Sequence, residues 1–205
     1  MAGGDLARGG TTAGELGAYI CFADESGQGL SPPRGRTWAR RGARPQVTVH
    51  VRKRGRVNAL GAACYRPGGH RPRFAYRLHT WHGRKNESKS FTLDEYRAFL
   101  TALHHQLHTP VVLVWDNVST HKTPEFTAWA ARQKWLRVFH LPRYAPELNA
   151  VEWIWSWLKR GIVNFLLAGI DDLEALVRSR LKQIQYRPDA ITGCLADTGL
   201  ITKPP

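Results

Sequence analysis

Three carboxylates stand where side chains could perform chemistry. Asp24 and Asp116 each close a short apolar run, and Glu152 lies in the first turn of a predicted helix. Taken singly, each is equally consistent with a turn former or a helix-dipole partner. Brought together without basic neighbours, they would repel one another, and a divalent cation would relieve that repulsion. Because Mg²⁺ takes oxygen ligands and keeps positions for water or phosphate, the trio predicts a magnesium site.

The apolar runs that precede the two aspartates predict buried strands. Residues 17–23 end at Asp24, and the continuous run 111–115 ends at Asp116, as is typical of strands covered on both faces. A further strand is predicted at 136–141. In sheets with helices on both faces, sites gather at strand ends, so we expect the two aspartates to lie close together.

The first half of the chain predicts an antiparallel arrangement. Residues 46–51 alternate valine with polar residues, and 57–65 form another apolar run. The five residues between them predict a hairpin whose tip carries Arg52, Lys53 and Arg54. Another strand is expected at 74–80.

Helices are predicted from their start signals. Thr92 and Glu95 form a capping box, and Thr123 precedes a proline at the first position of a helix that ends near Gln133. A helix is expected from about residue 150, and Asp171 is expected to cap a final one. The fold class is therefore α/β, with a mixed five-stranded sheet of three antiparallel strands followed by parallel strands, flanked by helices. Residues 1–16 show no periodicity and are expected to form a disordered tail.

Composition and charge indicate an intracellular protein that binds nucleic acid. The 205 residues suit one domain, and the formal net charge is +14. Fifteen Lys or Arg residues and no acidic residue lie between Ser26 and Asn86. Nucleic acid is the leading polyanion partner for such a stretch, and a solvated basic face is the alternative. Three dispersed cysteines suit a reducing cytoplasm, and no apolar run approaches the roughly 18 residues of a membrane span.

Three segments resemble the signature blocks of the DDE/D transposases, in particular the bacterial insertion-sequence branch of the mariner superfamily. They are CFADESGQG around Asp24, VVLVWDNVSTH around Asp116 and LPRYAPELNAVEWIWSWLK around Glu152. The last two carboxylates have 35 residues between them, a separation typical of this group. The resemblance implies a ribonuclease H-like catalytic domain over residues 17–200.

The resemblance also implies an activity. Asp24, Asp116 and Glu152 would hold two Mg²⁺ (or Mn²⁺) ions and catalyse in-line displacement at phosphorus. The site would first nick DNA and then join the freed end to another duplex. The implied partners are the transposon ends and target DNA, bound by a homodimer or higher assembly, and the implied location is the bacterial nucleoid in the cytoplasm.

Neighbouring residues are assigned supporting roles by the same blocks. We expect Asn117, His121 and Asn149 to orient the carboxylates or to contact DNA, although His121 could also be an ordinary surface histidine. Lys159 shares a helical face with Glu152 and could hold a phosphate or simply be solvated. Glu147 is a competing third ligand, which its position in a Pro-bounded loop disfavours.

Two other functions stay open at the level of sequence. The chain could be a ribonuclease H-like nuclease that cuts without transposing, or an inactive DNA-binding remnant of a transposase. Relatives in this group carry an amino-terminal helix-turn-helix region that recognises terminal repeats, and we expect this region to be absent here. The chain itself should then bind DNA mainly through phosphates.

Overall fold

A single five-stranded sheet organises the protein. The computed structural model describes residues 4–30, 40–42, 54–66, 68, 70–142, 145–163, 165, 167–196 and 198. The strands are β1 (Tyr19–Gly29), β2 (Arg56–Tyr65), β3 (Arg73–Trp81), β4 (Val111–Trp115) and β5 (Leu136–His140), and they lie in the order β3-β2-β1-β4-β5. β1 pairs antiparallel with β2, which pairs antiparallel with β3, whereas β1–β4 and β4–β5 are parallel. The predicted mixed sheet is confirmed.

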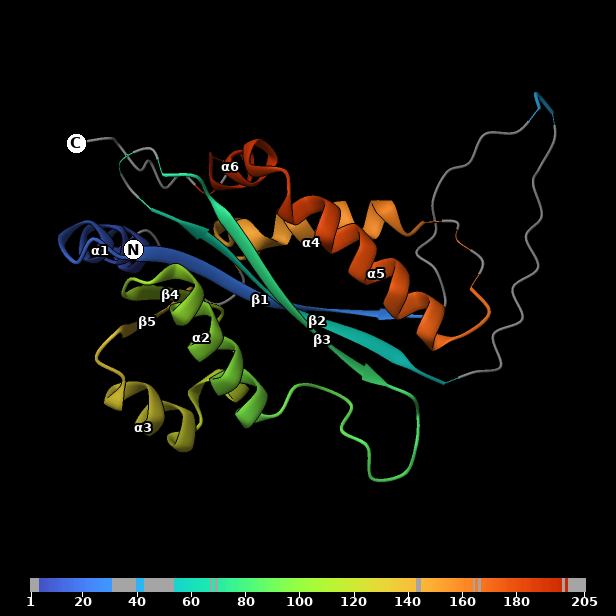
Figure 1. The fold of residues 1–205 in the computed structure, drawn as a ribbon, viewed down its shortest axis with the longest axis horizontal. Coiled ribbons are helices and arrows are strands. Elements are labelled where there is room, and N and C mark those ends of the chain that lie inside the picture. Colours follow the sequence, from blue (N-terminus) through green and yellow to red (C-terminus); the bar gives the residue numbers. More distant parts are fainter. Residues whose placement is uncertain are drawn as a thin grey trace.

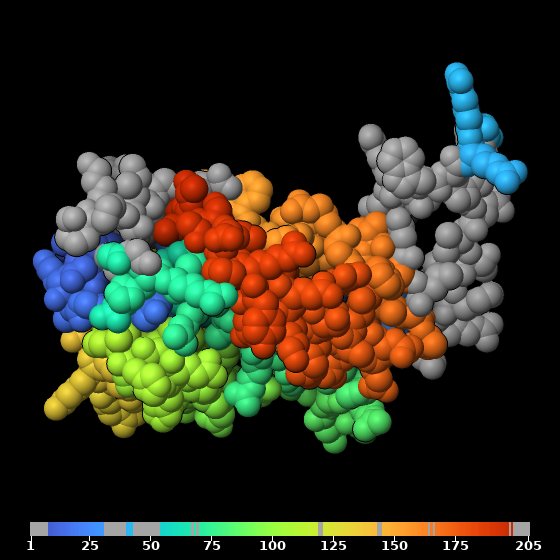
Figure 2. Space-filling model, turned by 45° about the horizontal axis from the view of Figure 1, so that its top comes forward, coloured from blue at the N-terminus to red at the C-terminus, as the bar shows by residue number. Residues whose placement is uncertain are grey.

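Helices cover both faces of the sheet (Figure 1). They are α1 (Gly4–Glu15), α2 (Leu93–Leu107), α3 (Pro124–Arg132), α4 (Ala150–Gly161), α5 (Ile170–Gln185) and α6 (Pro188–Ala196). One face packs against α2 and α3, and the other packs against α1, α4, α5 and α6. In the space-filling view, the orange and red atoms of the last three helices form one continuous surface (Figure 2).

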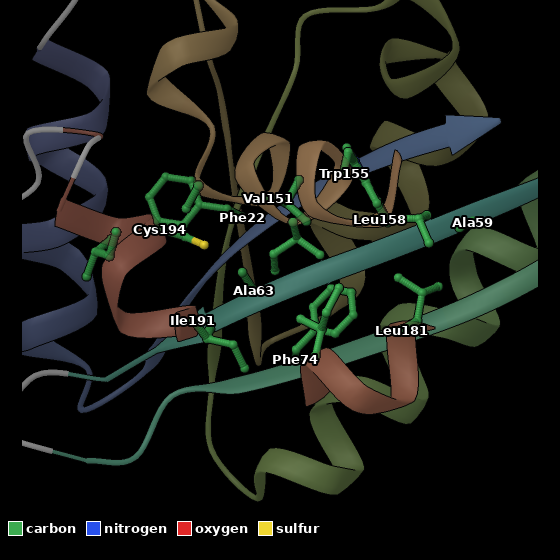
Figure 3. Close-up of a cluster of buried hydrophobic side chains, with 14 of the residues drawn as sticks. Phe22, Ala59, Ala63, Phe74, Val151, Trp155, Leu158, Leu181, Ile191 and Cys194 are labelled. Atoms are coloured by element: carbon green, nitrogen blue, oxygen red, sulfur yellow. The ribbon is translucent and has the colours of Figure 1, made fainter. Parts of the chain in front are cut away.

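The core beneath the last three helices is well filled. Phe22 of β1 and Ala63 of β2 face Trp155 and Leu158 of α4, and Ile191 of α6 closes the same cluster (Figure 3). All five side chains are fully buried. Because close-packed interiors resist shifts of even a methylene, this packing fixes α4 relative to β1. It therefore also fixes the side chains that the two elements present to each other.

The predicted helix starts are confirmed for α2 and α3. The Thr92 hydroxyl accepts a hydrogen bond from the Glu95 backbone, and the Glu95 carboxylate accepts one from the Thr92 backbone N–H. Thr123 caps α3 through the backbone N–H of Phe126, 3.2 Å away. α5 differs from prediction. Its N-cap is Gly169 rather than Asp171, and α6 follows it.

The prediction of a disordered tail at residues 1–16 is wrong for residues 4–15, which form helix α1. Sequence patterning misses this helix because its glycines and threonines have low helix propensity. Its small residues instead allow close packing on the sheet: Ala13 is fully buried, and Gly9 lies against Val112 and Phe139. Tertiary contacts therefore stabilise a segment that would be a poor helix on its own.

Residues 46–51, the first strand of the hairpin predicted with 57–65, lie outside the described ranges. The structure instead pairs β2 with β1 over its whole length, from Ile20 opposite Tyr65 to Gly29 opposite Arg56. β1 is consequently longer than the predicted strand, which ended before Asp24, because its polar second half still pairs through the backbone. No helix in the described ranges is long and apolar enough to cross a bilayer.

Candidate active site

Asp24, Asp116 and Glu152 line one cleft of about 420 Å³, which lies beyond the ends of β4 and β5. Asp24 lies on β1, Asp116 directly follows β4, and Glu152 lies in the first turn of α4. The parallel pairing of β1 with β4 brings the first two elements side by side, and α4 packs over β1. Three distant parts of the sequence thus meet at one place.

Asn149 fixes the start of α4 relative to β1. Its side chain accepts a hydrogen bond from the Val151 backbone N–H as the helix N-cap and donates one to the Ala23 carbonyl, 3.0 Å away. The side chain is 3% exposed. Because Ala23 and Glu152 are immediate neighbours of Asp24 and Val151 in the sequence, this link sets the relative position of the two carboxylates. Asn149 also lines the cleft.

Trp155 on α4 orients the Asp24 carboxylate through a hydrogen bond. Its indole Nε1 donates a hydrogen bond to Asp24 Oδ2 at 3.0 Å. The indole ring reaches this position because the residue opposite Asp24 on β2 is Gly61: a Cβ there would lie 2.6 Å from the ring. The close approach of α4 to β2 therefore requires glycine at this position.

The pKa of Asp24 is raised to about 7. Burial is the main cause, and the negative charges of Glu152 and Asp116 raise the pKa further. The backbone N–H of Glu25 and the indole of Trp155 act in the opposite direction, because they stabilise the ionised form. A carboxylate that is both buried and close to two others is a candidate functional group, since it is unstable as an anion without a cation.

A second set of hydrogen bonds surrounds Asp116. His121 Nδ1 lies 2.6 Å from Asp116 Oδ1, and its Nε2 lies 3.3 Å from Glu25 Oε1. The Tyr96 hydroxyl donates a short hydrogen bond to the same Glu25 oxygen. Burial lowers the pKa of His121, but the hydrogen bonds and charges of the two carboxylates outweigh it, so that the pKa is raised overall.

The oxygen atoms that line the cleft are suitable ligands for a hard divalent cation. The three carboxylates offer only oxygen, and Asn117, which also lines the cleft, has a buried Oδ1 with no hydrogen-bond partner in the described part of the chain. In their present conformations, no three His, Cys, Asp or Glu side chains among the described residues are placed so that they could hold a metal ion together. One oxygen each of Asp24 and Asp116 is held by Trp155 and His121. Side-chain rotation would have to bring the remaining oxygens onto an ion.

Among the other residues singled out in the sequence, Arg54, Glu147 and Lys159 do not line the cleft. Lys159 is exposed in the last turn of α4, and Arg54 is exposed just before β2, beside Gly83. Arg52 and Lys53 lie outside the described residues. Glu147, the competing third ligand, is exposed in a 3₁₀ turn and does not line the cleft.

Sequence reasoning missed one residue that contacts a candidate ligand, Trp155, and two that reach Asp116 only through His121, Glu25 and Tyr96. The hydrogen bond from Trp155 to Asp24 was not expected. The position of Trp155 one helical turn after Glu152 is the signal that could have shown it. Glu25 points to the sheet face opposite Asp24, because alternate residues of a strand diverge, and there it accepts a hydrogen bond from Tyr96 of α2. No sequence signal placed Tyr96 beside it, because that contact depends on how α2 packs.

Comparison with known proteins identifies the family. Residues 19–176 match the model of the DDE superfamily endonuclease family. No curated protein sequence is found as a match. Solved structures that share the fold include a Mos1 transposase paired-end complex with left transposon end (12% identity, TM-score 0.55, covering 97% of this chain and 61% of that one).

Two further structures are similar. They are a pre-cleavage Mos1 transpososome (13% identity, TM-score 0.56, 96% of this chain and 60% of that one) and the Mos1 transposase catalytic domain with raltegravir and Mn (12%, 0.50, 96% and 92%). The chain thus spans about three fifths of the first two transposase chains and nearly all of the isolated catalytic domain. The predicted ribonuclease H-like fold is confirmed. With its family model matched over more than half of its length, this chain belongs to the DDE superfamily of endonucleases.

Proposed function

We propose that this chain is the catalytic domain of a DNA transposase, which cuts DNA and joins the freed end to a second duplex. The observation that carries the proposal is the meeting of Asp24, Asp116 and Glu152 at one cleft. Membership of an endonuclease family and the transposon-end complexes among the similar structures support it.

We further propose that the three carboxylates hold two Mg²⁺ or Mn²⁺ ions. Bound divalent cations would neutralise charge on the scissile phosphate and acidify the attacking water or hydroxyl. Similar structures contain Mn or Mg, which supports the choice of cation. Asp24, with a pKa of about 7 when no cation is present, would lose its proton when an ion binds.

The remaining cleft residues orient rather than react. Trp155 and Asn149 fix Asp24 and the start of α4, so that the carboxylates face the cleft before DNA arrives. Exposed basic side chains would hold the phosphate backbone, Lys159 on the helix that carries Glu152 among them. The proposed partners are transposon ends and target DNA. Because two ends must be joined, at least two copies of the chain would assemble on DNA.

A nicking and joining assay tests this function. Wild-type protein with Mg²⁺ should both nick a labelled duplex and transfer the 3′ end to a second duplex. Asp116→Asn should abolish both reactions, whereas the matched Asp94→Asn, which changes a carboxylate that is 90% exposed on α2, should leave them intact. Nicking without joining would favour a nuclease. Equal behaviour of wild type and Asp116→Asn would refute catalysis by this cleft.

A further inference from the structure

The side chain of His121 is buried between two carboxylates, that of Asp116, which lines the cleft, and that of Glu25 on β1. It is 4% exposed, with Nδ1 at 2.6 Å from Asp116 Oδ1 and Nε2 at 3.3 Å from Glu25 Oε1. Ionised carboxylates only accept hydrogen bonds, so each contact needs a proton on the ring nitrogen concerned. The ring therefore bridges a candidate ligand and a carboxylate that does not line the cleft.

The ring has little freedom to turn. It stacks on Trp115 with centroids 3.8 Å apart and an interplanar angle of 26°, and it meets the edge of Tyr96 at 5.6 Å. Its own backbone N–H bonds to the Val118 carbonyl in the 3₁₀ turn after β4. Glu25 is fixed in turn by the Tyr96 hydroxyl, on the rigid helix α2. The packing thus defines the direction from which Asp116 receives its hydrogen bond.

The burial of His121 argues against a direct contact with DNA. A side chain that is 4% exposed and has both ring nitrogens engaged has no donor left for a phosphate. The contact with Asp116 instead occupies Oδ1 and leaves Oδ2 without a bond from this ring. Hydrogen bonds that orient a ligating carboxylate are the usual means by which a protein tunes a metal site.

We propose that His121, held by Glu25 and Tyr96, is a positioning residue that fixes the Asp116 carboxylate for binding a divalent cation. This inference rests on the proposed function, because it needs the cleft to bind the ion. Asp24 and Glu25 then serve the same site from opposite faces of β1: one as a ligand, the other as the anchor of the residue that orients a second ligand.

Three substitutions at His121 separate its two contacts. The amide nitrogen of His121→Asn lies close to the position of Nδ1 and can still donate to Asp116. The amide nitrogen of His121→Gln lies close to the position of Nε2 and can donate to Glu25 but not to Asp116. His121→Phe keeps the stack on Trp115 and removes both donors. His105→Phe, an exposed histidine on α2, is the matched control.

The readouts are the dissociation constant and spectrum of Mn²⁺, measured by electron paramagnetic resonance, with nicking rate and thermal midpoint recorded alongside. We expect His121→Gln and His121→Phe to weaken Mn²⁺ binding by about 10- to 100-fold and to broaden its spectrum. His121→Asn should stay within about threefold of wild type, as should the control. Thermal midpoints identify any variant that has lost its fold. If His121→Phe fails to fold, the comparison of His121→Asn with His121→Gln still tests whether the hydrogen bond to Asp116 matters.

Two results would overturn the inference. One is Mn²⁺ binding by His121→Gln that equals wild type; the other is an equal loss in the Asn and Gln variants, because a purely structural role would not distinguish them. Failure of the proposed function looks different: wild-type protein would bind no Mn²⁺ in the cleft, or would bind it without nicking DNA.

Discussion

Replacing Asp24 with Asn should stabilise the metal-free protein while it abolishes the proposed activity. Asp24 has a pKa of about 7 in the folded protein, compared with 3.8 for the free side chain, because burial and two nearby carboxylates disfavour its charge. The folded state therefore holds the proton more tightly than the unfolded state. Below pH 3.8 the side chain is protonated in both states and carries no cost. As the pH rises from 3.8 to about 7, the free energy of unfolding falls, because the folded state must then bury a charged carboxylate.

The magnitude follows from the size of the shift. At pH 8 the ionised carboxylate costs about 4 kcal/mol, since each pKa unit corresponds to about 1.4 kcal/mol. At pH 5 only part of this cost is present, about 2 kcal/mol. Asparagine carries no charge, and its carbonyl can still accept the hydrogen bond of Trp155. Asp24→Asn should therefore raise the free energy of unfolding by about 2 to 3 kcal/mol more at pH 8 than at pH 5.

Urea denaturation followed by tryptophan fluorescence, with EDTA present, measures this difference. Asp94→Asn on the exposed surface of α2 is the control, with a change near zero at both pH values. Adding Mg²⁺ at pH 8 should stabilise wild type but not Asp24→Asn, because binding to the folded state adds stability only where the site exists. Destabilisation by Asp24→Asn at pH 8, or a gain that does not change with pH, would refute the reasoning.

Two further substitutions test the surroundings of the site, and a salt titration tests how the protein binds DNA. Trp155→Phe removes the donor to Asp24 and should cost about 1–2 kcal/mol, more at pH 8 than at pH 5, in the same urea titration. Gly61→Ala places a Cβ 2.6 Å from the Trp155 ring and should lower stability by about 1–3 kcal/mol and slow nicking; unchanged stability would show that α4 can move away. Binding of non-specific duplex DNA should fall steeply between 50 and 200 mM salt in a fluorescence anisotropy titration, because contacts to phosphates release counterions. A salt-independent affinity would contradict a backbone-based interface.

The sequence predicts the sheet well because its signals are local. The continuous apolar run at β4 and the capping box of Thr92 and Glu95 each specify an element without reference to the rest of the chain. Helix α1 is different. Its glycines have low helix propensity, and its helical conformation is stabilised by packing against the sheet, where Gly9 contacts Val112 of β4 and Phe139 of β5 and Ala13 is buried.

The candidate site shows the same division. The three carboxylates could be found from their places after apolar runs and at a helix start, and the structure places them on one cleft. The residues that hold them could not. The hydrogen bond from Trp155 depends on the absence of a side chain at Gly61, and the contact of Tyr96 with Glu25 depends on how α2 packs against the sheet. These interactions arise only when the elements are packed together.

Anomalous diffraction from a crystal soaked in Mn²⁺ at pH 8 tests the metal site most directly. We predict anomalous density in the cleft, in contact with carboxylate oxygens of Asp24, Asp116 and Glu152, and no such density in crystals of Asp116→Asn. Mn²⁺ bound only elsewhere on the surface, or a cleft that remains empty at saturating Mn²⁺, would contradict a divalent-cation site formed by these three residues.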